Sequence, residues 1–161
     1  MCIRDRGYGG FPHWPPYLPS VYNRTLADNT DTKDIVISDT PWAVAWYADR
    51  MSVWLPQDLE QIEDIESIAK TQQTPVSAIL ITPYSYADGT VLRSVGGNNS
   101  PYGKLYPLVM GAWGYPGNSA NFIDTHPKFR SLSQRYPHKQ PLYSNGQIML
   151  YSARPISRSS D

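Results

Sequence analysis

The sequence predicts a small layered α/β domain with a mainly parallel sheet, about three parallel strands plus a C-terminal edge strand, and helices packed on it. First, strand-like and helix-like segments alternate from Lys33 to Thr82, which is typical of parallel strands joined by crossover helices. Second, residues 76–82 (VSAILIT) are apolar almost throughout, as in a central strand covered on both faces. Third, 161 residues suit one domain. The alternative is an α+β arrangement with a mixed sheet.

The first strand and helix are predicted from residues 35–48. Residues 35–37 form a short β-branched run, which favours a strand. Asp39 or Thr40 can then cap a helix whose first residue is Pro41. The chain is therefore expected to turn from strand to helix directly.

This helix contains two tryptophans one turn apart. Trp42, Ala45 and Trp46 lie at positions i, i+3 and i+4 and so share one face. Because indole rings bury a large apolar area, we expect this face to lie against the sheet.

Two further strands and a second helix continue the alternation. Residues 50–55 predict a strand that Pro56 ends, and residues 76–82 predict the central strand. The helix between them is expected to begin at Asp58. Its predicted buried face consists of Leu59, Ile62, Ile65, Ile68 and Ala69.

Outside this stretch, glycine and proline interrupt the patterns. A short helix is expected over residues 19–28. Residues 84–147 contain many breakers, and short helices are expected only around 106–113 and 126–136. Residues 146–154 alternate in the manner of an edge strand.

The chain divides into four parts. Residues 1–6 (MCIRDR) resemble a non-native N-terminus found in reading frames from environmental sequence, and we interpret them as a scar. Residues 7–19 read as an aromatic and proline-rich entry linker that docks, 20–155 as a single α/β domain, and 156–161 as a disordered tail. We therefore expect the chain to be the C-terminal part of a larger protein.

The composition excludes several classes of function. Fourteen basic residues balance fourteen acidic ones, so no net field attracts nucleic acid. Cys2 is the one cysteine, so neither an intrachain disulfide nor a cysteine metal site is expected. The apolar runs are far shorter than the roughly 20 residues that span a bilayer, so the fragment is expected to be soluble.

Asp39, Asp49 and Arg50 are the charged candidates for a binding site. Asp39 follows a strand, where open α/β sheets place ligand-binding residues, although a plain N-cap role is the simpler interpretation because Asp followed by Thr-Pro is a good cap. Asp49 and Arg50 can pair with each other, or Arg50 can grip a carboxylate or phosphate. The simpler interpretation is that Arg50 satisfies a carboxylate and helix-end carbonyls.

Four aromatic residues gather within thirteen positions: Trp42, Trp46, Tyr47 and Trp54. Stacked aromatic rings can bind sugars or lipid headgroups. Packing of the helix on the sheet is the alternative, and we expect it for at least two of the four.

Other catalytic and cofactor motifs are not found. No glycine-rich phosphate loop follows a predicted strand, and no Gly-x-Ser-x-Gly occurs. His13, His126 and His138 lack the spacing of metal ligands. We therefore expect no cofactor and no metal site in this chain.

Residues 37–56 (ISDTPWAVAWYADRMSVWLP) resemble the C-terminal extramembrane domain of bacterial polytopic membrane glycosyltransferases. These are family 39 and mannosyltransferase-like enzymes that use polyprenyl-phosphate sugar donors. The Pro15-Pro16-Tyr17 entry and the strand ending at Pro83 fit the same pattern.

The resemblance implies an accessory extracytoplasmic domain, inert alone, in a parent protein that crosses the cell membrane several times. The catalytic carboxylates of that family lie in the membrane half, so none is carried over to this chain. The implied partners are the membrane-embedded part of the same polypeptide and a polyprenyl-phosphate sugar or lipid headgroups, with Trp42, Trp54 and Tyr84 as test positions.

Two alternatives stay open. One is a free-standing small α/β enzyme that acts on a sugar or phosphate compound through Asp39 and Arg50. The other is a structural or protein-binding module.

Overall fold

The computed structural model describes residues 21–82, 103–105, 108, 123, 126–142 and 148–157. The strands are β1 (Ile35–Ser38), β2 (Met51–Trp54), β3 (Val76–Ile81), β4 (His138–Pro141) and β5 (Met149–Ser152). The α-helices are α1 (Pro41–Ala48), α2 (Leu59–Thr71) and α6 (Arg130–Arg135), and the shorter helical turns are η1 (Val21–Leu26), η3 (Gly103–Leu105) and η5 (Pro127–Phe129). The predicted small layered α/β domain is confirmed.

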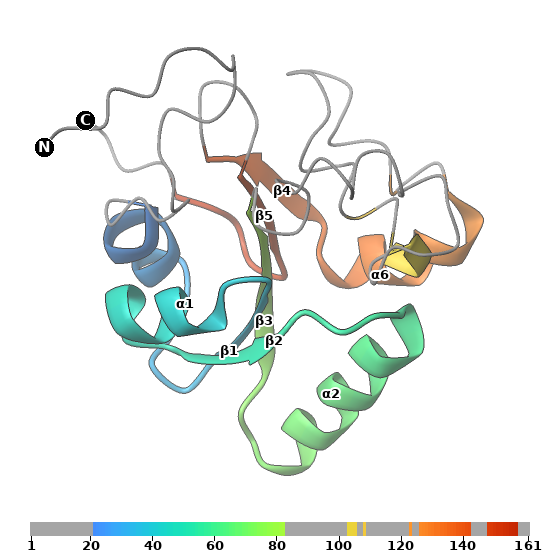
Figure 1. The fold of residues 1–161 in the computed structure, drawn as a ribbon, viewed down its shortest axis with the longest axis horizontal. Coiled ribbons are helices and arrows are strands. Elements are labelled where there is room, and N and C mark those ends of the chain that lie inside the picture. The colour runs from blue at the N-terminus through green and yellow to red at the C-terminus, as the bar shows by residue number, and fades with distance from the viewer. Residues whose placement is uncertain are drawn as a thin grey trace, which may run out of the picture.

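The five strands form one mixed sheet in the order β2-β1-β3-β5-β4. The strand β1 pairs in parallel with β2 on one side and with β3 on the other. The connection through α1 leads outward to β2, whereas the connection through α2 leads back across β1 to β3. Successive parallel connections in opposite directions place their helices on opposite faces of a sheet, and Figure 1 shows α1 and α2 on opposite sides.

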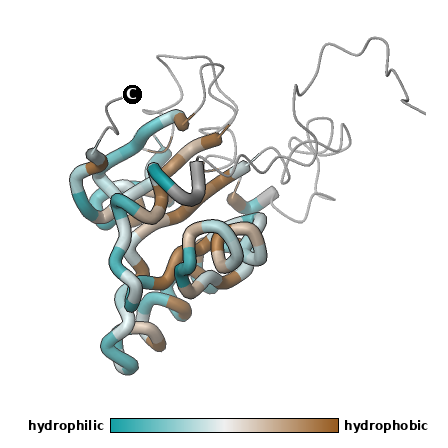
Figure 2. The backbone as a smooth tube through the Cα atoms, turned by 90° about the vertical axis from the view of Figure 1, so that its left-hand side faces the viewer, coloured by the Kyte–Doolittle hydropathy of each residue, from teal (hydrophilic) through white to brown (hydrophobic). Residues whose placement is uncertain are grey.

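Each face of the sheet has its own apolar core. The core on the α2 and α6 side contains Ile37, Ile79 and Ile81 from the strands. The core on the η1 and α1 side contains Val36 and Leu80. Figure 2 shows hydrophobic segments, coloured brown, in the interior of the domain. The strands β1, β3 and β5 are almost completely buried, which is the pattern of strands covered on both faces.

A register shift interrupts the pairing of β1 with β3. Ile35 pairs with Val76, whereas Val36 pairs with Ala78, so one extra residue of β3, Ser77, lies between the two pairs. A bulge of this kind changes by one residue which side chains of β3 point to each face of the sheet. As a result Val76 and Ile79 both pack against the same core.

The C-terminal part of the sheet differs from the prediction. The last strand, β5, is added to the three parallel strands by antiparallel pairing with β3. It does not lie at an edge of the sheet, as predicted, but between β3 and β4. The edge of the sheet beyond β5 is formed by β4, which the sequence did not predict. All four residues of β5 are buried.

The orientation of α1 contradicts the prediction that its tryptophan face lies against the sheet. The buried residues of the helix are Pro41, Ala43, Val44 and Ala48. Small side chains let the helix axis approach the sheet and η1 closely, so the bulky indoles of Trp42 and Trp46 lie on the outer side.

The helix α2 follows the prediction in part. Asp58 caps it, because its carboxylate accepts a hydrogen bond of 3.0 Å from the amide of Gln61, and this bond is the main cause of a lowered pKa of Asp58. Ile62 and Ala69 are buried as expected, but Ile68 is 59% exposed.

The short helices agree with the sequence where the structure describes them. The helix expected over 19–28 corresponds to η1, and that expected over 126–136 corresponds to η5 and α6. Most of the helix expected over 106–113, the entry linker 7–19 and residues 1–6 lie outside the described residues. Among the described residues, no helix combines the length and apolarity needed to cross a membrane.

Candidate functional site

The carboxyl ends of β1 and β3 meet at the point where the chain reverses direction across the sheet. Open α/β sheets bind ligands in the crevice at such a switch point. Asp39 follows β1 here, and Thr82 follows β3. Both residues are fully buried.

Asp39 is held by Thr82. The backbone N–H of Thr82 lies 3.0 Å from each carboxylate oxygen of Asp39, and its hydroxyl donates to Oδ2 at 3.1 Å. Asp39 therefore ties the end of β1 to the end of β3. The N-cap position of α1 is taken by Thr40, one of the two residues expected there, without a side-chain capping bond. Asp39, the other, lies one residue earlier, so its capping role is wrong.

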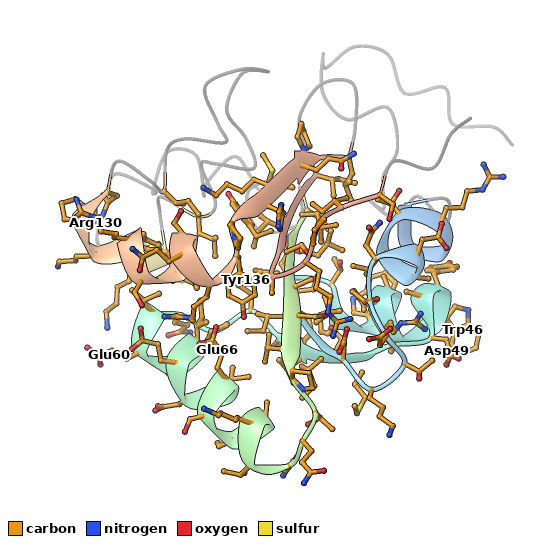
Figure 3. The ribbon with its side chains drawn as sticks, turned by 180° about the vertical axis from the view of Figure 1, so that it is seen from behind. Trp46, Asp49, Glu60, Glu66, Arg130 and Tyr136 are labelled. Atoms are coloured by element: carbon orange, nitrogen blue, oxygen red, sulfur yellow. The ribbon has the colours of Figure 1, made fainter. Side chains whose placement is uncertain are left out.

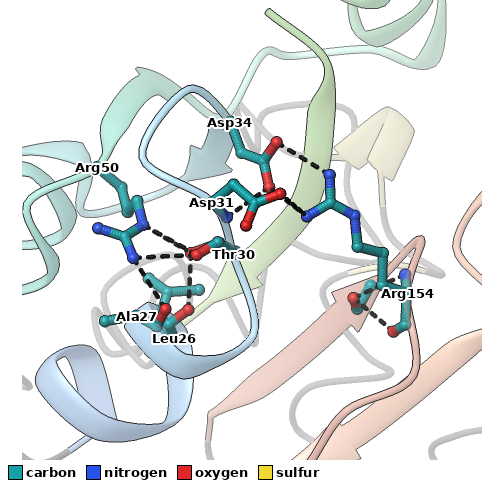
Figure 4. A network of polar contacts seen from close by, with 8 residues as sticks. Leu26, Ala27, Thr30, Asp31, Asp34, Arg50 and Arg154 are labelled. Carbon is teal, nitrogen blue, oxygen red and sulfur yellow. Dashed lines mark hydrogen bonds and ion pairs between the residues drawn. The ribbon is translucent and has the colours of Figure 1, made fainter.

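Arg50 satisfies backbone carbonyls at the opposite end of the strands. Its guanidinium group donates to the carbonyl oxygens of Ala27, Thr30, Ala48 and Asp49 over 2.9–3.2 Å, and to the hydroxyl of Thr30. Figure 4 shows its hydrogen bonds to Ala27 and Thr30. The simpler interpretation of Arg50 therefore agrees with its contacts as far as the helix-end carbonyls are concerned, whereas none of these acceptors is a carboxylate.

Asp39 and Arg50 do not form one site. Asp39 follows the last residue of β1, whereas Arg50 precedes the first residue of β2, and the two strands run parallel and in register. Arg50 is level with residue 34 of the neighbouring strand, so five residue steps, about 16 Å, separate the two residues along the strand direction. The expectation that both act on one substrate is therefore wrong.

A second polar network lies beside Arg50, also at the amino ends of the strands. Arg154 pairs with Asp31 at 2.6 Å and with the buried Asp34 at 3.0 Å. The backbone N–H of Asp31 donates to Asp34 as well, at 2.7 Å. These contacts, drawn in Figure 4, fasten the segment after β5 to the loop before β1. They engage both carboxylates, so we assign the network a structural role.

Three exposed tryptophans lie on the α1 side of the sheet. The exposed fractions are 45% for Trp42, 83% for Trp46 and 54% for Trp54. Trp54 pairs with Ser38, and the alternation along β2 directs it to the face that α1 covers, because Val53 packs on the other face. We call Trp42, Trp46 and Trp54 the tryptophan surface.

The location of the tryptophan surface follows from the direction of α1. The helix begins with Trp42 beside the carboxyl ends of the strands, where Trp54 also lies. Trp46 is one turn further along, and Figure 3 shows it on the outer side of the helix, away from the sheet. The expectation that at least two of the four aromatics pack in the core is wrong, since only Tyr47 packs against a core cluster.

Two other predicted site residues are placed as follows. Asp49 is exposed and ends α1 in the left-handed region at φ 52°, and Figure 3 shows it beside Trp46. Tyr84 lies outside the described residues.

A groove of about 610 Å³ lies between α2, α6 and the start of β3. Tyr136 donates to Glu66 at 2.7 Å, and Arg135 pairs with the same carboxylate at 2.9 Å. Burial, and then the negative charge of Glu66, raise the pKa of Tyr136 well above its usual value. Figure 3 shows Glu66 and Tyr136 facing each other. We interpret the cluster as a link between α2 and the end of α6.

Sequence reasoning missed Thr82 as the partner of Asp39. A usable signal was present, because Thr82 directly follows the predicted central strand, at the edge where Asp39 follows the first one. Glu66 and Tyr136 are 70 residues apart in the sequence, so no local sequence pattern indicates that they form a hydrogen bond.

Within the part of the chain that the structure describes, no group of three or more metal-ligating side chains is found. No protein family model, no curated protein and no solved structure matches the chain. The fold and the site define a small α/β domain with a buried carboxylate at the switch point and an exposed tryptophan surface beside it.

Proposed function

We propose that the chain is an accessory extracytoplasmic domain of a membrane-embedded glycosyltransferase, inert alone, that contributes to acceptor or donor access. One observation supports this proposal above others: the tryptophan surface leaves three large indoles exposed on one helix and the adjoining edge strand. Large exposed apolar groups mark places where a domain meets another protein or a membrane. The membrane-embedded part of the same polypeptide is the proposed partner.

The charged groups of the described residues favour an accessory role over an independent enzyme. Asp39 is engaged by Thr82, and Arg50 by four backbone carbonyls. A catalytic pair needs two groups within hydrogen-bond reach of one reacting atom, and these two lie at opposite ends of β1 and β2. The resemblance of residues 37–56 to the extramembrane domain of polytopic glycosyltransferases points the same way.

The first test is the coding sequence upstream of codon 7. The proposal expects several apolar segments of about 20 residues there, each long enough to span a bilayer. A native start directly before Gly7 would contradict it.

The second test measures sugar transfer by the full-length protein. Alanine at both Trp42 and Trp54 is expected to lower transfer about tenfold, because central aromatic contacts dominate docking surfaces. Substitution of Tyr84 is expected to lower transfer too. Ile68→Ala is the matched control, since Ile68 is also a large apolar residue that is about half exposed, but it belongs to α2 on the other side of the sheet. Unchanged transfer in the tryptophan variant contradicts the proposal.

The second candidate function is a free-standing enzyme that acts on a sugar or phosphate compound. The position of Asp39 at the switch point favours it. It predicts that the isolated chain turns over such a compound and that Asp39→Asn abolishes the turnover while the fold persists. Inactivity of the isolated chain would favour the accessory domain or a structural module.

A further inference from the structure

We infer that the edge of the sheet at β2 pairs with the same edge of a second copy of this chain, as two antiparallel strands related by a twofold axis. The sheet ends at β2 on one side and at β4 on the other. The inference concerns the main chain of β2, and it goes beyond the proposed function without resting on it. The two tryptophans of α1 stay available to the partner proposed above.

Two residues of β2 direct their main-chain groups away from the sheet. The N–H of Leu55 donates to the carbonyl oxygen of Ser38 at 2.8 Å, so Leu55 faces β1. The main-chain groups of successive residues alternate between the two sides of a strand, so Val53 also faces β1. Ser52 and Trp54 therefore face outward, and within the described part of the chain no main-chain partner lies on that side. The edge thus offers N–H donors and carbonyl acceptors to another extended chain.

The opposite edge of the sheet is blocked, whereas the β2 edge is not. The N–H of Leu142 donates to Ile148 of the neighbouring segment, so in β4 the alternation directs Lys139 and Pro141 outward. Proline has no N–H to offer, and lysine at an edge opposes pairing with another chain. Both edge strands have 4 residues, so length does not distinguish them. Because β2 (MSVW) contains neither a charge nor a proline, its edge is open to a further strand.

The side chains of β2 agree with an uncovered edge. Met51 is 45% exposed and Trp54 54%, and the two residues between them are partly exposed. The strands β1, β3 and β5, which have a neighbour on both sides, are almost completely buried. The strand β2 therefore differs from the inner strands as a strand with one missing neighbour should.

A second copy of β2 fits this edge in one antiparallel register. A twofold axis at Val53 places Ser52 of each copy opposite Trp54 of the other. Only this register pairs both outward residues with each other, so that each pair exchanges both of its main-chain hydrogen bonds. The small serine side chain leaves room for the indole opposite it on the same face. Because β2 carries no charge, the symmetry brings no like charges together within the strand pair.

The test is sedimentation velocity of the 161-residue chain from about 1 μM to about 1 mM. The wild-type chain is expected to form a dimer as its concentration rises. Ser52→Pro removes one outward N–H from each copy, so we expect the dissociation constant of the dimer to rise at least about tenfold. Ser52→Ala is the matched control, because it loses the same hydroxyl bond to Val36 but keeps the N–H. This control is expected to dimerise as the wild type does.

Trp54→Lys is a second edge variant, for use if Ser52→Pro does not fold. In the proposed register it brings two lysines onto neighbouring strands, on diagonal positions of one face. We expect it to weaken the dimer at least about tenfold as well, because lysine at an edge opposes strand pairing. Thermal unfolding followed by far-ultraviolet circular dichroism shows whether each variant is folded.

Four results would overturn the inference. The first is a wild-type chain that stays monomeric up to about 1 mM. The second is a dimer that persists unchanged in every folded edge variant, and the third is an equal loss in Ser52→Pro and Ser52→Ala. The fourth is growth beyond the dimer, because a twofold contact closes on itself and leaves no further edge to pair.

Discussion

At the scale of single residues, Asp39 is the polar side chain that most directly joins two strands. Its carboxylate accepts both the N–H and the hydroxyl of Thr82, and all these groups are buried. Asp39→Ala leaves a buried N–H without this acceptor, so we expect a loss of about 2–3 kcal/mol in the free energy of unfolding. Urea unfolding measures it. Thr82→Val keeps the N–H donor and removes the hydroxyl, and is expected to lose only about 1 kcal/mol.

Tyr136 gives the protein a predicted sensitivity to alkali. Its pKa is raised in the folded state by burial and by Glu66, whereas the unfolded chain releases this proton near pH 10. The contribution to stability is therefore complete below about pH 10 and is lost as the pH rises beyond it, by up to about 1.4 kcal/mol per pH unit. Urea midpoints between pH 8 and about 11 are expected to fall more steeply in the wild type than in Tyr136→Phe. Parallel curves for the two proteins would show that Tyr136 ionises equally in both states.

At the scale of elements, Arg50 holds the end of α1 against the segment after η1. Its planar fork reaches the carbonyls of Ala48, Ala27 and Thr30 at the same time. Arg50→Lys retains the charge but loses this geometry, so we expect about 1–2 kcal/mol less stability and faster amide exchange in α1. The matched control is Arg130→Lys at an exposed position of α6, which Figure 3 shows pointing outward. Equal effects of the two substitutions would contradict the assigned role.

The sequence predicted that α1 exists, but not which way it faces. Apart from its proline, α1 contains only tryptophan, alanine, valine and tyrosine, so its apolar residues do not define one face. In such a helix the close approach of small side chains competes with burial of large ones. Here Ala43, Val44 and Ala48 are buried, and their small size lets α1 lie close to the sheet and η1. Which face of α1 is buried therefore depends on the neighbouring elements rather than on the spacing of its apolar residues.

At the scale of the whole molecule, the parallel half depends on the C-terminal strands. Residues 21–82 contain β1, β2 and β3, but β5 covers the outer edge of β3. The core on the α2 side also takes Phe129, Leu132 and Tyr151 from later in the chain. A fragment that ends at Thr82 is therefore expected to lack cooperative thermal unfolding, as followed by far-ultraviolet circular dichroism. A sharp transition in this fragment would show that the parallel half folds alone.

The strand order was predictable only in part. The pattern from Lys33 to Thr82 is local, because each strand and helix has its own period and caps, and that half agrees with the structure. The strand β4 (HKQP) is short, polar and ends in proline, which is tolerated at an edge but does not resemble a strand. The position of β5 inside the sheet results from pairing over long sequence distances, which no local pattern records.

The place of β5 also affects how the chain is made. During synthesis this strand leaves the ribosome after every other strand described, yet it must enter between β3 and β4. Until it does, two strand edges and both apolar cores stay open to other chains. Folding is therefore expected to be completed late and slowly, as in other proteins dominated by distant pairings, and a nascent chain stalled before Met149 is the form in which chaperone binding would matter most.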